Sequence, residues 1–187
     1  GYVEFSSINF DYGPIFSTFG YNEVEGLRLR AGGRTYFGPN DLWRLEGFVA
    51  YGFRDNKFKY GISGKWLLDK KSRLTIFGGT RRDIEQIGAS LTSSTDVLGR
   101  SLASNNDKLT NINLTTLGAE IEPIRNLGLR FNTSYRTLAS ASPTFSLDYN
   151  DPTSPTGVSS EIKQFETRFS VAYFPKRQMT GFGVERK

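Results

Sequence analysis

The chain has 187 residues and a formal net charge of +5, from 24 Lys and Arg against 19 Asp and Glu. It contains no cysteine and no histidine, which excludes disulfides, thiolate chemistry, the usual zinc ligand sets and any His-based catalytic triad. No apolar run approaches the roughly 18 residues of a transmembrane helix, and no nucleic-acid-binding motif accompanies the positive charge. We therefore expect no enzyme, no metal, no cofactor and no nucleic-acid partner.

Apolar and polar side chains alternate along most of the chain, and this period of two predicts β-strands rather than helices. We expect strands at about 2–10, 24–37, 42–53, 58–69, 73–81, 109–122, 127–138 and 162–174. The first of these has a weak pattern. In 109–122 the apolar positions change parity between Leu114 and Leu117, which predicts a β-bulge there.

The connections between these strands are of two kinds. Polar stretches at 83–108 and 139–160 are predicted long external loops, and both fall on the same side of an up-and-down meander, as in outer-membrane barrels. Most strands run about 10–14 residues, longer than the usual 5–6 and sufficient for the about 9–11 residues that cross a membrane. Short polar turns are predicted at 38–41, 54–57, 70–73 and 123–126.

These features predict an all-β fold, an antiparallel up-and-down transmembrane β-barrel of about eight strands that occupies residues 1–187 as a single region. The chain begins with GYVEF and ends with GVERK, so we expect it to be an arc of a larger barrel. The alternative is a soluble β-sandwich, in which the same apolar face is the core.

The two faces of the predicted strands differ in chemistry. An arginine on the lipid-facing side at the midplane of a bilayer costs roughly 2–4 kcal/mol, so we expect the charged parity to face the barrel lumen. The predicted lumen-facing residues are Arg28, Arg30, Arg34, Arg44, Glu46, Lys59, Lys65, Arg130, Arg136, Glu166 and Arg168. The apolar parity often ends in aromatic residues, as in an interfacial girdle, and is predicted to face lipid. Its residues are Leu27, Leu29, Phe37, Trp43, Leu45, Val49, Tyr51, Phe53, Phe58, Tyr60, Ile62, Trp66, Leu129, Phe131, Phe165, Phe169, Val171 and Tyr173.

The charges of the predicted lumen allow two interpretations. Either they form an interior ion-pair network that plugs or rigidifies the barrel, or they line an anion-attracting channel. Asp83 and Glu85 stand beside Arg81 and Arg82. We expect these carboxylates to form ion pairs at the barrel rim rather than to serve acid–base chemistry.

Three stretches of the chain carry a family resemblance. They are YNEVEGLRLRAG at 21–32, GFVAYGFRDNKFKYGISGKW at 47–66 and RRDIEQIGAS at 81–90. Together they resemble the outer-membrane barrel region of a large Bacteroidetes family of unknown function, whose members typically carry an N-terminal carboxypeptidase-regulatory-like domain. The first stretch is also similar to strands of surface-antigen (BamA-like) assembly barrels. The resemblance implies an integral barrel in the bacterial outer membrane and supplies no catalytic residues.

The function that we expect is that of a structural or scaffold subunit of an outer-membrane complex, in protein export or assembly. Its expected partners are outer-membrane lipids and other outer-membrane or periplasmic proteins. A transport or channel barrel with a basic, anion-attracting lumen is the first alternative. A soluble β-domain that binds a ligand or partner is the second.

Overall fold

A computed structural model describes residues 2–35, 42–86, 109–142 and 146–174, and in this part the chain is all-β with antiparallel pairing. Two single 3₁₀ turns, η1 (Ser6–Ile8) and η2 (Ile15–Ser17), interrupt the first strands. The strands are β1 (Val3–Phe5), β2 (Phe10–Tyr12), β3 (Phe19–Asn22), β4 (Gly26–Thr35), β5 (Trp43–Gly52), β6 (Lys57–Asp69), β7 (Leu74–Gln86), β8 (Leu109–Ile124), β9 (Leu127–Ser140), β10 (Tyr149–Asn150), β11 (Val158–Ser159) and β12 (Glu161–Tyr173). None of the helical segments in these ranges has the length and hydropathy of a transmembrane helix.

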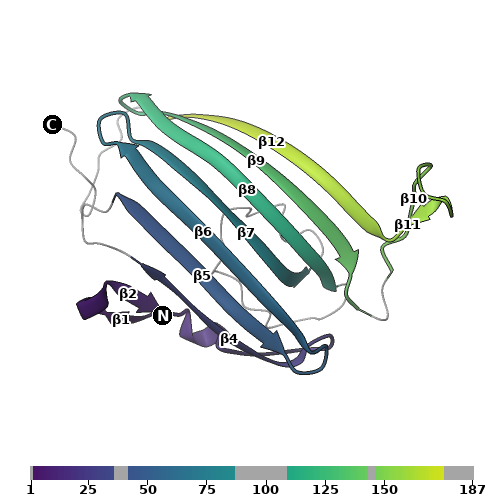
Figure 1. Ribbon diagram of the computed structural model, residues 1–187. Coiled ribbons are helices and arrows are strands. Elements are labelled where there is room, and N and C mark those ends of the chain that lie inside the picture. Colours follow the sequence, from purple (N-terminus) through teal and green to yellow (C-terminus); the bar gives the residue numbers. More distant parts are fainter. Residues whose placement is uncertain (1, 36–41, 87–108, 143–145, 175–187) are drawn as a thin grey trace.

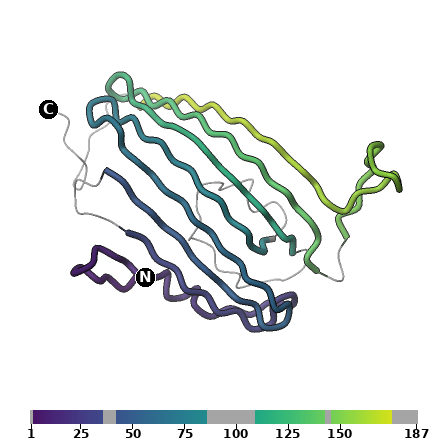
Figure 2. The backbone as a smooth tube through the Cα atoms, in the orientation of Figure 1, coloured from purple at the N-terminus to yellow at the C-terminus, as the bar shows by residue number. Residues whose placement is uncertain are grey.

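Ten strands form one bent sheet (Figure 1). Nine of them lie side by side in the order β1-β2-β4-β5-β6-β7-β8-β9-β12, and β3 also pairs with β4. From β4 onward each long strand pairs with the next long strand of the chain, which is the predicted up-and-down meander. The sheet is not closed, because no pairing joins β1 to β12 in the described part. The small hairpin of β10 and β11 projects from one end (Figure 2).

The two edges of this sheet differ. At the N-terminal edge, β2 and β3 pair with separate parts of β4, and the chain between them leaves the sheet through η2. The predicted strand at 2–10 is therefore replaced by short strands and a 3₁₀ turn. At the other edge β12 pairs with β9 over all thirteen of its residues without a register shift. An irregular edge resists further pairing, whereas a long regular edge is a template for it.

The structure corrects one predicted bulge and two predicted strand ends. β8 pairs with β7 without interruption from Leu109 to Glu120, so the predicted bulge at Leu114–Leu117 is wrong. Instead the two leucines lie on opposite faces, with Leu114 buried and Leu117 exposed. β7 continues to Gln86 rather than ending before the loop predicted at 83–108, and β9 continues to Ser140.

Candidate functional site: a buried ionic cluster

The pairing register assigns the residues of the sheet to two faces, because directly paired residues of antiparallel strands point to the same side. Arg30 pairs with Ala50, and Ala50 with Lys59. On the other side, Leu29 pairs with Tyr51. We call the side that carries Arg30 and Lys59 the charged face, and the opposite side the apolar face.

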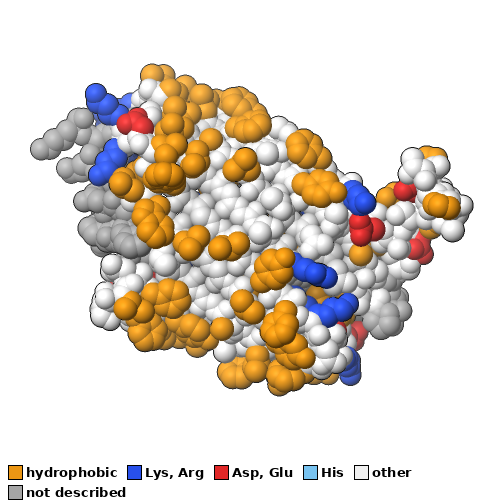
Figure 3. All heavy atoms as spheres, in the orientation of Figure 1, with side chains coloured by type: hydrophobic (Ala, Val, Ile, Leu, Met, Phe, Trp, Pro, Cys, Tyr) orange, Lys and Arg blue, Asp and Glu red, His pale blue; other side chains and the backbone are white. Residues whose placement is uncertain are grey.

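Most of the apolar face is exposed. Large apolar side chains of β4 to β12 form hydrophobic patches on it, with smaller and polar side chains between them (Figure 3). Phe165 is 70% exposed and Phe58 67%. Every described residue that the sequence predicts to face lipid lies on this side, by direct pairing or by strand parity. Phe37 lies outside the described residues.

The charged face, by contrast, buries much of its charge. All eleven residues predicted to face a lumen lie on this side by their register. Arg136 is 0% exposed, Lys59 3% and Arg28 5%. Arg44, Lys65 and Arg168 are exposed; the remaining members are buried or half-buried.

Part of the charged face is apolar, which the sequence pattern did not predict. Ile112, Leu114 and Leu138 form a buried cluster, and Ile162 of β12 packs against it. These residues lie toward the ends of β8 and β9 that adjoin the two predicted long loops. The charged face therefore also carries buried apolar side chains, and the register places them directly beside charged ones, as in the pairs Ile112–Asp83 and Leu114–Arg81.

The charged face holds a buried ionic cluster centred on Glu25, in the turn between β3 and β4. The Glu25 carboxylate lies 3.1 Å from Nη1 of Arg28 and 2.8 Å from Nζ of Lys59. Nη1 of Arg28 also lies 2.8 Å from Oδ1 of Asp83 on β7, and Lys59 forms a second ion pair with Asp55. Three carboxylates thus surround two cations, and they come from β4, β6, β7 and two turns.

Local structure places Glu25 at this point. The Asn22 side-chain oxygen accepts hydrogen bonds from the backbone N–H groups of Val24 and Glu25, at 3.1 and 2.8 Å, and Nδ2 of Asn22 donates to the Glu25 carboxylate at 2.6 Å. Gly26 follows with φ of +64°, which a glycine adopts without steric cost. The turn therefore directs Glu25 under the sheet, where its side chain is 0% exposed.

Gly52 leaves room for the cluster. It pairs with Arg28 in the β4–β5 register. A Cβ atom at this position would lie 2.8 Å from Cβ of Glu25 and 2.9 Å from Nζ of Lys59. Any side chain on residue 52 would therefore displace the groups that form the ion pairs.

The three stretches that carry the family resemblance meet in this cluster. The first supplies Asn22, Glu25 and Arg28, the second Asp55 and Lys59 together with Gly52, and the third Asp83. Sequence reasoning placed Arg28 and Lys59 on the charged parity and expected Asp83 to form an ion pair. It missed Glu25, although the Asn-x-x-Glu-Gly turn in which it lies was part of the first stretch.

Electrostatics keep the central carboxylate ionised. Burial by itself raises the pKa of Glu25, but the charge of Arg28 and the hydrogen bonds from Lys59 and Asn22 outweigh this effect. The pKa is therefore below its ordinary value of 4.5.

Further ion pairs lie elsewhere on the charged face. Arg81 pairs with Glu85 along β7, and Arg34 lies 2.8 Å from Asp11 of β2. Glu166 of β12 accepts from Arg136 and Arg168, at 2.5 and 2.6 Å. Arg30 donates to Ser17 at 2.7 Å and lies over the Phe48 ring at 4.2 Å. Carboxylates thus neutralise Arg34, Arg81, Arg136 and Arg168, whereas the Arg30 guanidinium contacts a hydroxyl group and an aromatic ring.

Within the described ranges, no group of three or more carboxylate, His or Cys side chains is arranged to hold a metal ion. What the cluster does provide is an electrostatic connection between strands that are distant in sequence, since Arg28 and Asp83 are 55 residues apart.

Comparison with known proteins identifies a family without an assigned activity. The sequence pattern of the C-terminal domain of a family of unknown function (DUF5686) matches residues 2–137. This range contains all the residues of the ionic cluster. No curated protein and no solved structure matches the chain.

Proposed function

We propose that this chain, which belongs to the family of unknown function DUF5686, forms part of the wall of a β-barrel in a bacterial outer membrane of the Bacteroidetes type. In this proposal the apolar face contacts lipid and the charged face turns to the interior. The chain serves as a structural or scaffold element of an outer-membrane complex, in export or assembly.

The observation that carries this proposal is the inverted distribution of side chains over the two faces. Lys59 is 3% exposed, whereas its neighbours in β6, Phe58 and Tyr60, are 67% and 48% exposed. Water-soluble monomers rarely expose contiguous apolar patches larger than a few hundred Å², whereas a lipid-facing barrel wall has this distribution. The soluble β-sandwich alternative would require another layer over the apolar face.

Strand length and edge geometry support the same proposal. β6, β7 and β12 each have 13 residues, more than the about 9–11 that cross a bilayer at the usual tilt. In the described part, β12 has a strand on one side only. Because unpaired backbone groups cost several kcal/mol each in hydrocarbon, we expect further strands to pair with β12 in the membrane, in keeping with an arc of a larger barrel.

The ion pairs favour a structural role over an anion-attracting channel. The cations of the buried cluster face carboxylates within about 3 Å, as do Arg34, Arg81 and Arg136 on the rest of the face. A cation whose charge is neutralised by a fixed carboxylate attracts mobile anions weakly. We therefore propose that these residues join neighbouring strands rather than line a permeation path.

Membrane fractionation tests the proposal. The intact protein, expressed in a bacterium with an outer membrane, is expected in the outer-membrane fraction, resistant to alkaline carbonate and released by detergent. Recovery in the soluble fraction, or release by carbonate, would contradict membrane insertion. Two further experiments distinguish the scaffold role from the channel role. The scaffold role predicts that envelope proteins co-purify in a pulldown from detergent-solubilised membranes. A large anion-selective conductance in planar-bilayer recording would favour the channel role instead.

A further inference from the structure

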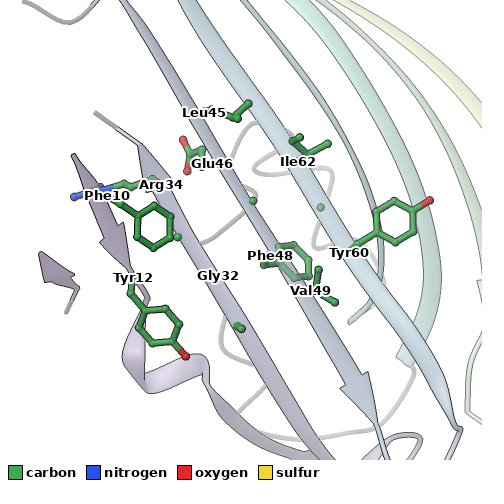
Figure 4. A pocket seen from close by; sticks show the side chains of 14 residues that line it. Phe10, Tyr12, Gly32, Arg34, Leu45, Glu46, Phe48, Val49, Tyr60 and Ile62 are labelled. Atoms are coloured by element: carbon green, nitrogen blue, oxygen red, sulfur yellow. The ribbon is translucent and has the colours of Figure 1, made fainter. Parts of the chain in front are cut away.

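An apolar groove of about 560 Å³ crosses the apolar face near the N-terminal edge. Its floor is backbone, at Ala31, Gly33 and Gly47, where small residues of β4 and β5 face one another. The walls come from three strands: Phe10 and Tyr12 of β2, Leu45 and Val49 of β5, and Tyr60 and Ile62 of β6 (Figure 4). The volume lies within the about 300–1,000 Å³ of small-molecule sites.

The groove results from the placement of two glycines. Gly33 and Gly47 are direct partners in the β4–β5 register, so the surface lacks side chains where its neighbours carry Leu45 and Val49. The ring of Phe10 lies over Gly33, at a place where a Cβ atom would collide with it. The result is an open groove between the larger side chains of β2, β5 and β6.

The side chain of Arg82 provides a positive charge next to this groove. Arg82 is exposed, and it pairs directly with Tyr60 in the β6–β7 register, on the apolar face. Its other paired neighbour on this face is Asn113 of β8. Among the residues that the structure describes, Arg82 has no carboxylate within ion-pair distance. Arg82 lies four residues before the end of β7, near the membrane interface in the proposed orientation, where the negatively charged phosphate of a lipid is available to an arginine.

We propose that the groove binds one acyl chain of a phosphate-bearing membrane lipid whose phosphate contacts Arg82. The planar guanidinium of arginine matches the geometry of phosphate oxygens, and the groove offers the apolar channel that the attached chain requires. This inference rests on the proposed function, because it places the apolar face in lipid. It adds a specific lipid site to a surface that would otherwise contact lipid without preference.

The test uses the intact protein, purified from membranes in detergent, with phosphatidylglycerol and the corresponding diacylglycerol as probes. Native mass spectrometry measures how much of each lipid stays bound to the protein while collisional activation removes the detergent. We expect one phosphatidylglycerol to be retained well beyond the diacylglycerol. Arg82→Gln is expected to lower its affinity by about tenfold or more, the effect of one lost charge-assisted hydrogen bond.

Matched variants control for non-specific effects. Val49→Phe fills the groove and should reduce retention, whereas Val171→Phe adds the same ring to the apolar face outside the groove and should not; the two valines are 54% and 60% exposed. Lys163→Gln removes an exposed cation of the same face, on β12, and should leave retention unchanged.

Two results would overturn the inference. One is equal retention in Arg82→Gln and Lys163→Gln, and the other is equal retention in Val49→Phe and Val171→Phe. Either would mean that bound lipid is distributed over the surface rather than held in the groove. Failure of the proposed function has a different signature, since the unmodified protein would then not be recovered from the membrane fraction at all.

Discussion

Removal of the Arg28 cation should destabilise the protein more than removal of the Glu25 carboxylate, although the two groups are partners. In the unmodified cluster, three carboxylates (Glu25, Asp55 and Asp83) are paired with two cations (Arg28 and Lys59), which leaves one excess negative charge. Arg28→Met leaves three carboxylates with one cation, and Asp83 loses its ion pair with Arg28. Glu25→Gln leaves two carboxylates with two cations, each of which keeps one carboxylate partner.

The magnitudes follow from burial. Arg28 and Asp83 are 6% and 12% exposed in their side chains, and breaking a buried pair in this way costs about 3–5 kcal/mol of unfolding free energy. Glu25→Gln loses charged hydrogen bonds but leaves no uncompensated charge, at a cost of about 1–3 kcal/mol.

Denaturant unfolding in detergent micelles measures both changes. The two tryptophans of the chain, Trp43 and Trp66, are direct partners in the β5–β6 register, so their fluorescence reports separation of these strands. We expect Arg28→Met to lower the unfolding free energy more than Glu25→Gln does. The reasoning about charge balance is refuted if Arg28→Met costs no more than Glu25→Gln.

Three further predictions concern the same cluster. Gly52→Ala should lower the unfolding free energy by about 1–3 kcal/mol through overpacking. Gly64→Ala is the control and should change it little, because a Cβ atom there would lie at an ordinary 3.5 Å from its nearest neighbour. Equal effects of the two variants in denaturant unfolding would contradict the close packing at Gly52. The stability that Glu25 contributes should be fully present above pH about 4.5 and be lost as the pH falls through its lowered pKa. The unfolding free energy of Glu25→Gln should therefore depend less on pH than that of the unmodified protein. The same pH dependence in both proteins would contradict an ionised Glu25 carboxylate. Asn22→Ala should lower the unfolding free energy by about 1–2 kcal/mol, because the turn loses its side-chain hydrogen bonds. Heat-dependent gel mobility measures the temperature at which the protein unfolds, and an unchanged temperature in the variant would contradict this prediction.

The strands and their faces could be predicted from the sequence because both depend on local patterns. Alternation along 58–69 determines which side chains of β6 share a face, and polar turns such as 70–73 mark where strands end. The pattern misled at β8, where the prediction assumed that the charged face is polar throughout. Ile112 and Leu114 belong to that face and are buried there at 1% and 4% exposure, so no bulge is needed to explain the change of parity.

The ionic cluster could not be predicted because its contacts depend on register between distant strands. Arg28 and Asp83 become neighbours only through the pairing of β4 to β7 by way of β5 and β6. The irregular N-terminal edge had a local signal that the prediction did not use: Pro14 cannot donate to a ladder and follows Gly13 where β2 leaves the sheet.

Residue-by-residue accessibility along β6 tests whether the apolar face lies in lipid and the charged face does not. Because the chain has no cysteine, single cysteines at 58–66 can each carry one spin label in the intact, membrane-reconstituted protein. We expect an alternation with period two, in which labels that replace Phe58, Tyr60 and Ile62 collide with oxygen dissolved in lipid and labels that replace Gly61 and Ser63 do not. High accessibility to a water-soluble relaxation agent at the first three positions would contradict it.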